Sequence, residues 1–132
     1  MLEESSVLSA NAAFYKAFEL RDIQAMEDIW VKDARPTCIH PGQAPLVGRK
    51  QVIKSWKNIL VDGSAASITC SNAYAFIYGN CAYVICQERL ECNVLIATNM
   101  FLKEEDTWKI THHQASPTLN LGSVAPAPKT LQ

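Results

Sequence analysis

The residues of this chain that could carry chemistry lie mostly in its second half, inside stretches that are otherwise apolar. Two adjacent imidazoles, His112 and His113, come near the end of an apolar run, and Asn99 interrupts another such run. Imidazole titrates close to neutral pH and serves as a general base or a ligand-binding group. An amide held in an apolar strand must find hydrogen-bond partners. Together these side chains indicate a polar pocket at the rim of a sheet.

Only one of the two histidines can point into the core if their strand is regular, because successive side chains face opposite sides of a sheet. Trp108, Ile110 and His112 would then share one face. For His112, a structural, hydrogen-bonded histidine and a general base or ligand-binding imidazole are both open interpretations. For Asn99, a structural cross-strand hydrogen bond and a donor to a substrate are both open.

His40 and Glu88 are two further candidates. His40 follows a short apolar segment and precedes a Pro-Gly turn, which is typical of a residue at a pocket mouth. It is either an exposed loop histidine or a base, and His40→Ala should change stability by no more than about ±0.5 kcal/mol. Glu88 continues the alternation of small apolar residues on its strand, so it would face the interior and need pairing, hydrogen bonding or a proton. A strand that bulges or ends earlier would leave Glu88 in water.

The elements that position these residues begin with three helices, predicted from apolar spacing. The first spans about residues 7–20, and Asp22 is a candidate N-cap for a short second helix that buries Trp30. A small strand at 37–39 and a loop follow. The third helix runs from after Gly48 to about residue 62 and contains Trp56. We expect Trp30 and Trp56 to be core residues, and lining the pocket is the second interpretation.

The rest of the chain predicts an antiparallel meander of four strands near 68–78, 81–91, 94–103 and 107–116. Gly79-Asn80 is a two-residue hairpin signal, and the resulting register places Tyr74, Phe76, Tyr78 and Tyr83 on one face. The opposite face is also apolar. Since a lone antiparallel sheet normally exposes one polar face to water, helices should cover one side and a second copy of the chain the other. We therefore expect a homodimer.

Composition favours one domain in the cytoplasm. The chain has 132 residues, 12 basic and 13 acidic side chains and a formal charge of −1, which argues against a nucleic-acid partner. No run reaches the roughly 18–20 apolar residues of a membrane helix. Five cysteines without a Cys-x-x-Cys pair suggest free thiols. No spacing predicts a metal site or a cofactor. We expect a domain at 1–117 and a flexible tail at 118–132.

In its order of elements the chain resembles the SnoaL-like branch of the nuclear transport factor 2-like superfamily over roughly residues 7–117. The residues that carry the resemblance lie in five segments: Phe18 to Trp30, Cys38-Ile39-His40-Pro41-Gly42, Leu46-Val47-Gly48-Arg49, Ser55-Trp56, and Trp108 to Pro117. The resemblance implies an α+β fold in which a curved sheet wraps around three N-terminal helices as a cone with an apolar pocket. It also implies homodimers that pack sheet to sheet.

The same resemblance supplies a comparison with steroid delta-isomerases, which are related to this branch together with polyketide cyclases. Their general-base aspartate falls on His40, their oxyanion-hole tyrosine on Phe14 and their oxyanion-hole carboxylic acid on Asn99. Phe14 cannot donate a hydrogen bond. Two functions stay open. One is an isomerase, cyclase or dehydratase acting on a small apolar molecule, with His40 as base, Asn99 and His112 orienting a carbonyl, and pocket walls from Phe14, Trp30, Trp56 and Glu88. The other is a non-catalytic dimerisation or ligand-binding module.

Overall fold

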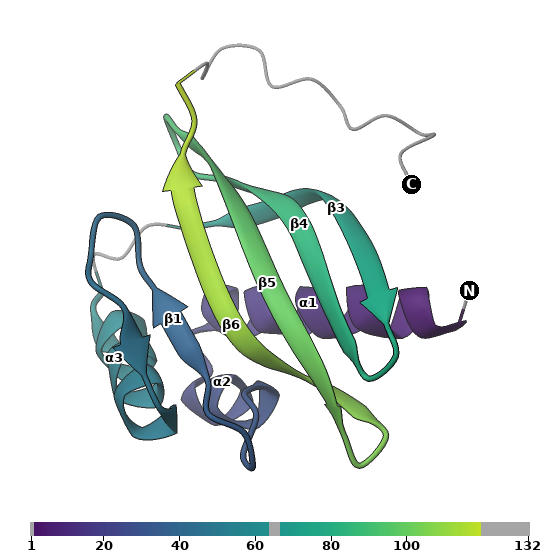
Figure 1. The fold of residues 1–132 in the computed structure, drawn as a ribbon. Helices are drawn as coiled ribbons and strands as arrows, with labels where there is room; N and C mark the ends of the chain where they lie inside the picture. The colour runs from purple at the N-terminus through teal and green to yellow at the C-terminus, as the bar shows by residue number, and fades with distance from the viewer. Residues whose placement is uncertain (1, 64–66, 120–132) are drawn as a thin grey trace.

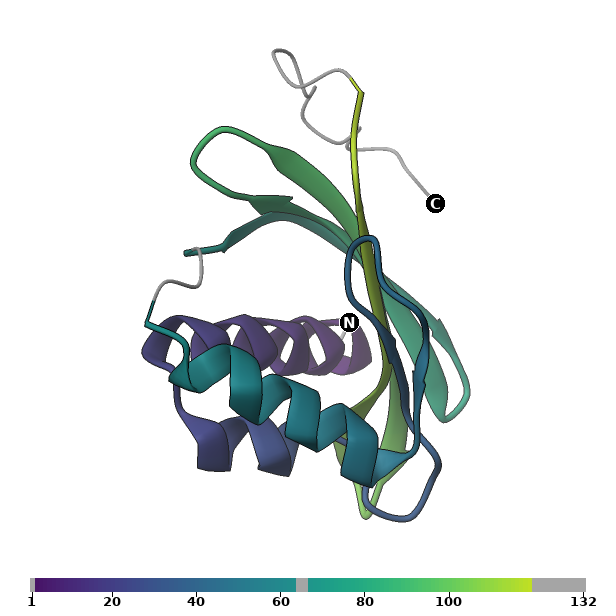
Figure 2. The same cartoon turned by 90° about the vertical axis from the view of Figure 1, so that its left-hand side faces the viewer.

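One curved sheet carries all the helices on its concave side (Figures 1 and 2). The computed structural model describes residues 2–63 and 67–119. Its elements are α1 (Leu2–Leu20), α2 (Ile23–Ile29), β1 (Thr37–Ile39), β2 (Leu46–Val47), α3 (Arg49–Val61), β3 (Thr69–Tyr78), β4 (Cys81–Arg89), β5 (Val94–Glu104) and β6 (Thr107–Pro117). The predicted α+β cone of three helices against a curved sheet is confirmed.

The sheet has six strands in the order β2-β1-β6-β5-β4-β3. The four long strands form the predicted antiparallel meander. The short β1 joins this meander in parallel with β6, with Thr37 opposite His112, and β2 pairs with β1. This parallel pairing joins segments 75 residues apart and has no local sequence signal. It places the end of β1, and therefore His40, beside the histidines of β6.

The start of α2 follows from its capping residue. The Asp22 carboxylate accepts a hydrogen bond of 3.1 Å from the backbone N–H of Ala25, which confirms the predicted N-cap of α2. Helix α1 begins at Leu2, earlier than predicted, and Glu3 and Glu4 lie in its first turn. Carboxylates there interact favourably with the positive end of the helix dipole.

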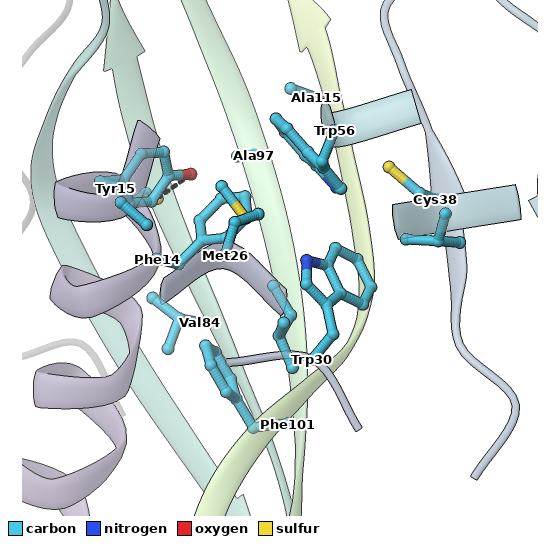
Figure 3. Close-up of a cluster of buried hydrophobic side chains, with 14 of the residues drawn as sticks. Phe14, Tyr15, Met26, Trp30, Cys38, Trp56, Val84, Ala97, Phe101 and Ala115 are labelled. Carbon is cyan, nitrogen blue, oxygen red and sulfur yellow. Dashed lines mark hydrogen bonds between the residues drawn. The ribbon is translucent and has the colours of Figure 1, made fainter. Parts of the chain in front are cut away.

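The core lies between the concave face of the sheet and the helices. The predicted hairpin register is confirmed, since Tyr78 pairs with Cys81 and Phe76 with Tyr83. The alternating residues of β4 that face inward are all buried: Ala82, Val84, Cys86 and Glu88. Phe14 of α1 lies edge-to-face against Trp56, with 5.3 Å between ring centroids, and against Trp30 at 6.4 Å. Figure 3 shows these three rings within the buried cluster.

Only the first part of the expected C-terminal tail is described. The backbone N–H of Thr118 donates to the carbonyl oxygen of Val94 at 3.1 Å. Residues 120–132, on which the rest of that prediction falls, lie outside the described residues. No helix in the described ranges is long and apolar enough to cross a membrane.

Candidate functional site

A cavity of about 450 Å³ lies on the concave side, between α1, α3 and the sheet. Its wall is largely apolar and includes Phe14, Phe18, Trp56, Ile59, Ile68 and Leu95. Four groups that can exchange protons also reach the cavity: Tyr15, His40, Glu88 and His113. The described lining contains no lysine or arginine. Such a site suits a mainly apolar ligand that few polar groups orient.

His113, and not His112, faces this cavity. The pairing of β5 with β6 shifts between Met100, opposite His112, and Phe101, opposite Ile110, so Thr111 is an extra residue in β6. A β-bulge of this kind reverses the alternation beyond it. The prediction that His112 shares the face of Trp108 and Ile110 is therefore wrong. His112 lies on the convex face with Thr37, whose Oγ1 is 2.6 Å from His112 Nδ1.

Asn99 is fully buried but does not line the cavity. Its amide nitrogen donates to Asn11 Oδ1 at 2.9 Å and to Tyr15 Oη at 3.1 Å. Its amide oxygen lies 2.5 Å from Nδ1 of His113. Of the two interpretations left open for Asn99, the structure has the cross-strand hydrogen bond, to His113 on the neighbouring strand. Since both amide hydrogens are also used within the protein, a direct contact with a substrate has no support in this geometry. The residue holds its neighbours in place.

Glu88 faces the interior, as the alternation of β4 predicts, and its side chain is 3% exposed. Tyr15 Oη donates to Glu88 Oε2 at 2.6 Å. Burial raises the pKa of Glu88, and the hydrogen bond from Tyr15 acts in the opposite direction. Burial is the larger effect because a buried carboxyl group loses solvation by water when it ionises. Glu88 is thus a carboxyl group poised to hold a proton.

His113 lies beside Glu88, with 3.8 Å between its Nε2 and Glu88 Oε2. Burial lowers the pKa of His113 to about 3, and the nearby imidazoles of His40 and His112 act in the same direction. At neutral pH the ring is therefore uncharged. Neutral imidazole has one N–H donor and one nitrogen with a free lone pair.

His40 lines the cavity from the end of β1, but it is only 7% exposed and therefore not a free loop histidine. The hydroxyl of Ser55 donates to Val52 O at 2.8 Å, so His40 Nε2, 3.0 Å from Ser55 Oγ, acts as the donor in that pair. In the neutral ring this leaves the lone pair on Nδ1. Burial also lowers the pKa of His40. Because its ring packs on Trp56 at 5.0 Å, His40→Ala should cost more stability than the sequence suggested.

The remaining predicted wall residues separate into two groups. Phe14 and Trp56 line the cavity, whereas Trp30 is fully buried and does not line it. Sequence reasoning overlooked Tyr15, whose hydroxyl is central to the site. A signal existed: Asn11 and Tyr15 are four residues apart, and both lie on the helix face of Val7 and Phe18. Polar residues on an apolar helix face are candidates for a buried network.

Comparison with known proteins defines the class of the protein. The model of the SnoaL-like domain family matches residues 7–120, and the chain belongs to this family. Among solved structures, it is similar to a proposed dehydratase of the nuclear transport factor 2-like family from Streptomyces avermitilis (30% identity, 89% of this chain and 97% of that chain, TM-score 0.82). A search of curated proteins found no match.

Two further structures show the range of this fold. One is a proposed calcium/calmodulin-dependent protein kinase type II association domain from Thiobacillus denitrificans (30% identity, 83% of this chain and 92% of that chain, TM-score 0.75). The other is a nuclear transport factor 2-like protein of unknown function from Pseudomonas putida (14% identity, 99% of this chain and 97% of that chain, TM-score 0.79). The first of these is similar to this chain in sequence as well as fold, and the second in fold alone.

Proposed function

We propose that this protein is an enzyme that removes water from a small, uncharged hydroxy carbonyl compound bound in the cavity. The observation that carries the proposal is the convergence of His40, Glu88, Tyr15 and His113 on one apolar cavity. Titratable groups whose pKa values are displaced by burial inside a cleft are typical of acid–base sites. The 30% identical dehydratase-like structure from Streptomyces avermitilis supports the same reaction class.

Dehydration needs a base for the proton on carbon and an acid for the departing hydroxyl group. We assign His40 Nδ1 as the base, since its Nε2–H is engaged with Ser55. We assign protonated Glu88 as the acid, since burial favours its neutral form. The carbon–hydrogen electron pair forms the new double bond, the carbon–oxygen bond breaks, and the hydroxyl leaves as water with the Glu88 proton. Tyr15 then stabilises the carboxylate through its hydrogen bond.

The cavity selects against charged substrates. A carboxylate or phosphate there would lose water and find no cationic side chain in the described lining. The substrate class is therefore neutral, with a carbonyl group that acidifies the adjacent carbon–hydrogen bond and a hydroxyl group on the following carbon.

We expect the protein to convert cyclic β-hydroxy ketones to enones, measured by the absorbance of the conjugated product. His40→Gln keeps an N–H group able to reach Ser55 but removes the base, so turnover should fall by on the order of a hundredfold or more. His112→Gln makes the same change on the convex face and should retain activity. Equal activity in the two variants would overturn the role of His40. If none of several cyclic β-hydroxy ketones is converted while the ketone β-tetralone binds tightly, the result would favour a non-catalytic ligand-binding module.

The second candidate is a non-catalytic dimerisation or ligand-binding module. It is favoured by the similarity to the proposed kinase association domain and by the aromatic convex face of β3 and β4. Tyr83 stacks on Phe76 at 5.0 Å and on Tyr78 at 6.1 Å, and Tyr78 is 66% exposed. We propose that a second copy of the chain covers this face in either case, because its stacked aromatic rings form an apolar surface that a matching copy would bury.

A substitution that introduces one charge into the aromatic face tests the homodimer. Tyr83→Glu places a carboxylate among the stacked rings and should convert the dimer to a monomer of about half the mass by light scattering, because an unpaired charge in an apolar interface is costly. Asn80→Glu adds the same charge in the β3–β4 turn and should leave the dimer intact. A wild-type protein that is monomeric at micromolar concentration would rule out the dimer.

A further inference from the structure

A row of hydrogen bonds behind the cavity wall includes two asparagines that the mechanism above does not use. Asn11 is 2% exposed, Asn99 is fully buried, and neither lines the cavity. Asn99 lies at the centre of the row, bonded to Asn11, to Tyr15 and to His113. Tyr15 continues the row to Glu88. Buried amides of this kind are costly unless every polar atom is used, which points to a role for their arrangement.

The amide oxygen of Asn99 fixes the tautomer of His113. An amide oxygen can only accept a hydrogen bond, so Nδ1 of His113, 2.5 Å away, must carry the hydrogen. In the neutral ring the lone pair is then on Nε2. This is the nitrogen that lies 3.8 Å from Glu88 Oε2, and His113 itself lines the cavity. The acceptor nitrogen therefore lies beside the proposed acid.

Asn11 determines which way round the Asn99 amide sits. One hydrogen of Asn99 Nδ2 goes to Asn11 Oδ1 and the other to Tyr15 Oη. The nitrogen of Asn11 points at sulfur atoms, 3.6 Å from Cys70 Sγ and 4.0 Å from Cys86 Sγ, which leaves its oxygen for Asn99. If the Asn99 amide rotated by half a turn, its nitrogen would face His113 and its oxygen would face the oxygen of Asn11. That like pairing is unfavourable.

We propose that Asn99, and Asn11 behind it, are positioning residues that hold His113 in the Nδ1–H tautomer, so that the lone pair of Nε2 accepts a hydrogen bond from the departing hydroxyl group of the substrate. The hydroxyl oxygen is then turned toward the Glu88 proton. No proton moves to or from either asparagine. The role toward a substrate rests on the proposed dehydration, whereas the tautomer is a property of the ligand-free protein.

The test is the tautomer of His113, read from two-bond hydrogen–nitrogen NMR correlations of the full chain labelled with nitrogen-15 at pH 7. The wild-type ring should show hydrogen on Nδ1 and none on Nε2. Asn11→Ala removes the oxygen that orients Asn99, so at least half of the Nδ1–H signal should be lost. Asn11→Asp keeps an oxygen at that position and should restore the wild-type pattern. Ser9→Ala, an exposed change in the same helix, should have no effect.

The proposal and the dehydration fail in different ways. A wild-type His113 that carries hydrogen on Nε2, or that is an imidazolium at pH 7, would overturn the positioning role whether or not the variants fold. A wild-type tautomer unchanged in folded Asn11→Ala would overturn the role of Asn11. With a substrate, Asn11→Ala should lower kcat on the order of a hundredfold with little change in KM. A correct tautomer without any turnover would refute the proposed reaction and leave the tautomer assignment standing.

Discussion

Glu88→Gln should abolish turnover and at the same time stabilise the folded protein at neutral and alkaline pH. Glutamine fills the same volume and retains an oxygen that accepts from Tyr15, but it has no acidic proton for the departing hydroxyl. Loss of the acid should lower kcat by on the order of 10²- to 10⁴-fold. An exchange of activity for stability is expected where a buried acid serves chemistry rather than folding.

The sign of the stability effect follows from proton linkage. Burial raises the pKa of Glu88 in the folded state, above its unfolded value of about 4.3. At this site the folded state therefore holds a proton that the unfolded chain has lost between the two pKa values, and the contribution of Glu88 to stability falls as pH rises through that window. Glutamine does not titrate, so the gap between variant and wild type should widen as pH rises above about 4.3 and level off above the folded pKa.

Urea unfolding at several pH values between 4 and 9 measures this gap. Glu91→Gln, in the exposed turn after β4, removes one negative charge from the same hairpin and should show no such widening. If Glu88→Gln were less stable than wild type at every pH, Glu88 would be an ionised structural partner. If its turnover also matched wild type, the acid would have to be sought elsewhere in the cavity.

The parts of this site that the sequence predicted are those governed by local periodicity. Alternation along β4 placed Glu88 inside, and the Gly79-Asn80 turn defined the register of β3 against β4. The Pro-Gly turn placed His40 at the end of its strand. These inferences succeed because a strand buried on one face admits only one register.

The parts that could not be predicted depend on a single inserted residue or on distant pairing. Because of the bulge at Thr111, His113 and not His112 faces the cavity. Nothing in the residues around Thr111 distinguishes a bulged from a regular strand. The parallel contact of β1 with β6 arises only in the folded chain. The sequence did not single out Tyr15, because its aromatic ring fits the apolar periodicity of the helix as any core residue would. Its hydroxyl group can be recognised as part of the site only once the fold places it within hydrogen-bond distance of Glu88.

His113 should make the wild-type protein acid-sensitive. Burial lowers its pKa to about 3 in the folded state, against about 6.5 in the unfolded chain. At this site the unfolded chain therefore binds a proton that the folded state does not hold between these values, and the contribution of His113 to stability is lost as pH falls through this window. For a ring buried this completely, the loss between pH 7 and pH 3 should be on the order of 5 kcal/mol of unfolding free energy.

His113→Asn separates this effect from packing. The asparagine nitrogen can occupy the position of Nδ1 and keep the hydrogen bond to Asn99, while the cavity left by the ring should cost about 1–3 kcal/mol at pH 7. Its stability should nevertheless fall much less than that of wild type between pH 6.5 and pH 4, as measured by urea unfolding across that range. His112→Asn changes the half-buried histidine on the convex face and should retain most of the acid sensitivity.

Parallel pH profiles for wild type and His113→Asn would mean that His113 is already protonated in the folded protein and paired with an ionised Glu88. That result would refute the neutral pair on which the proposed acid depends.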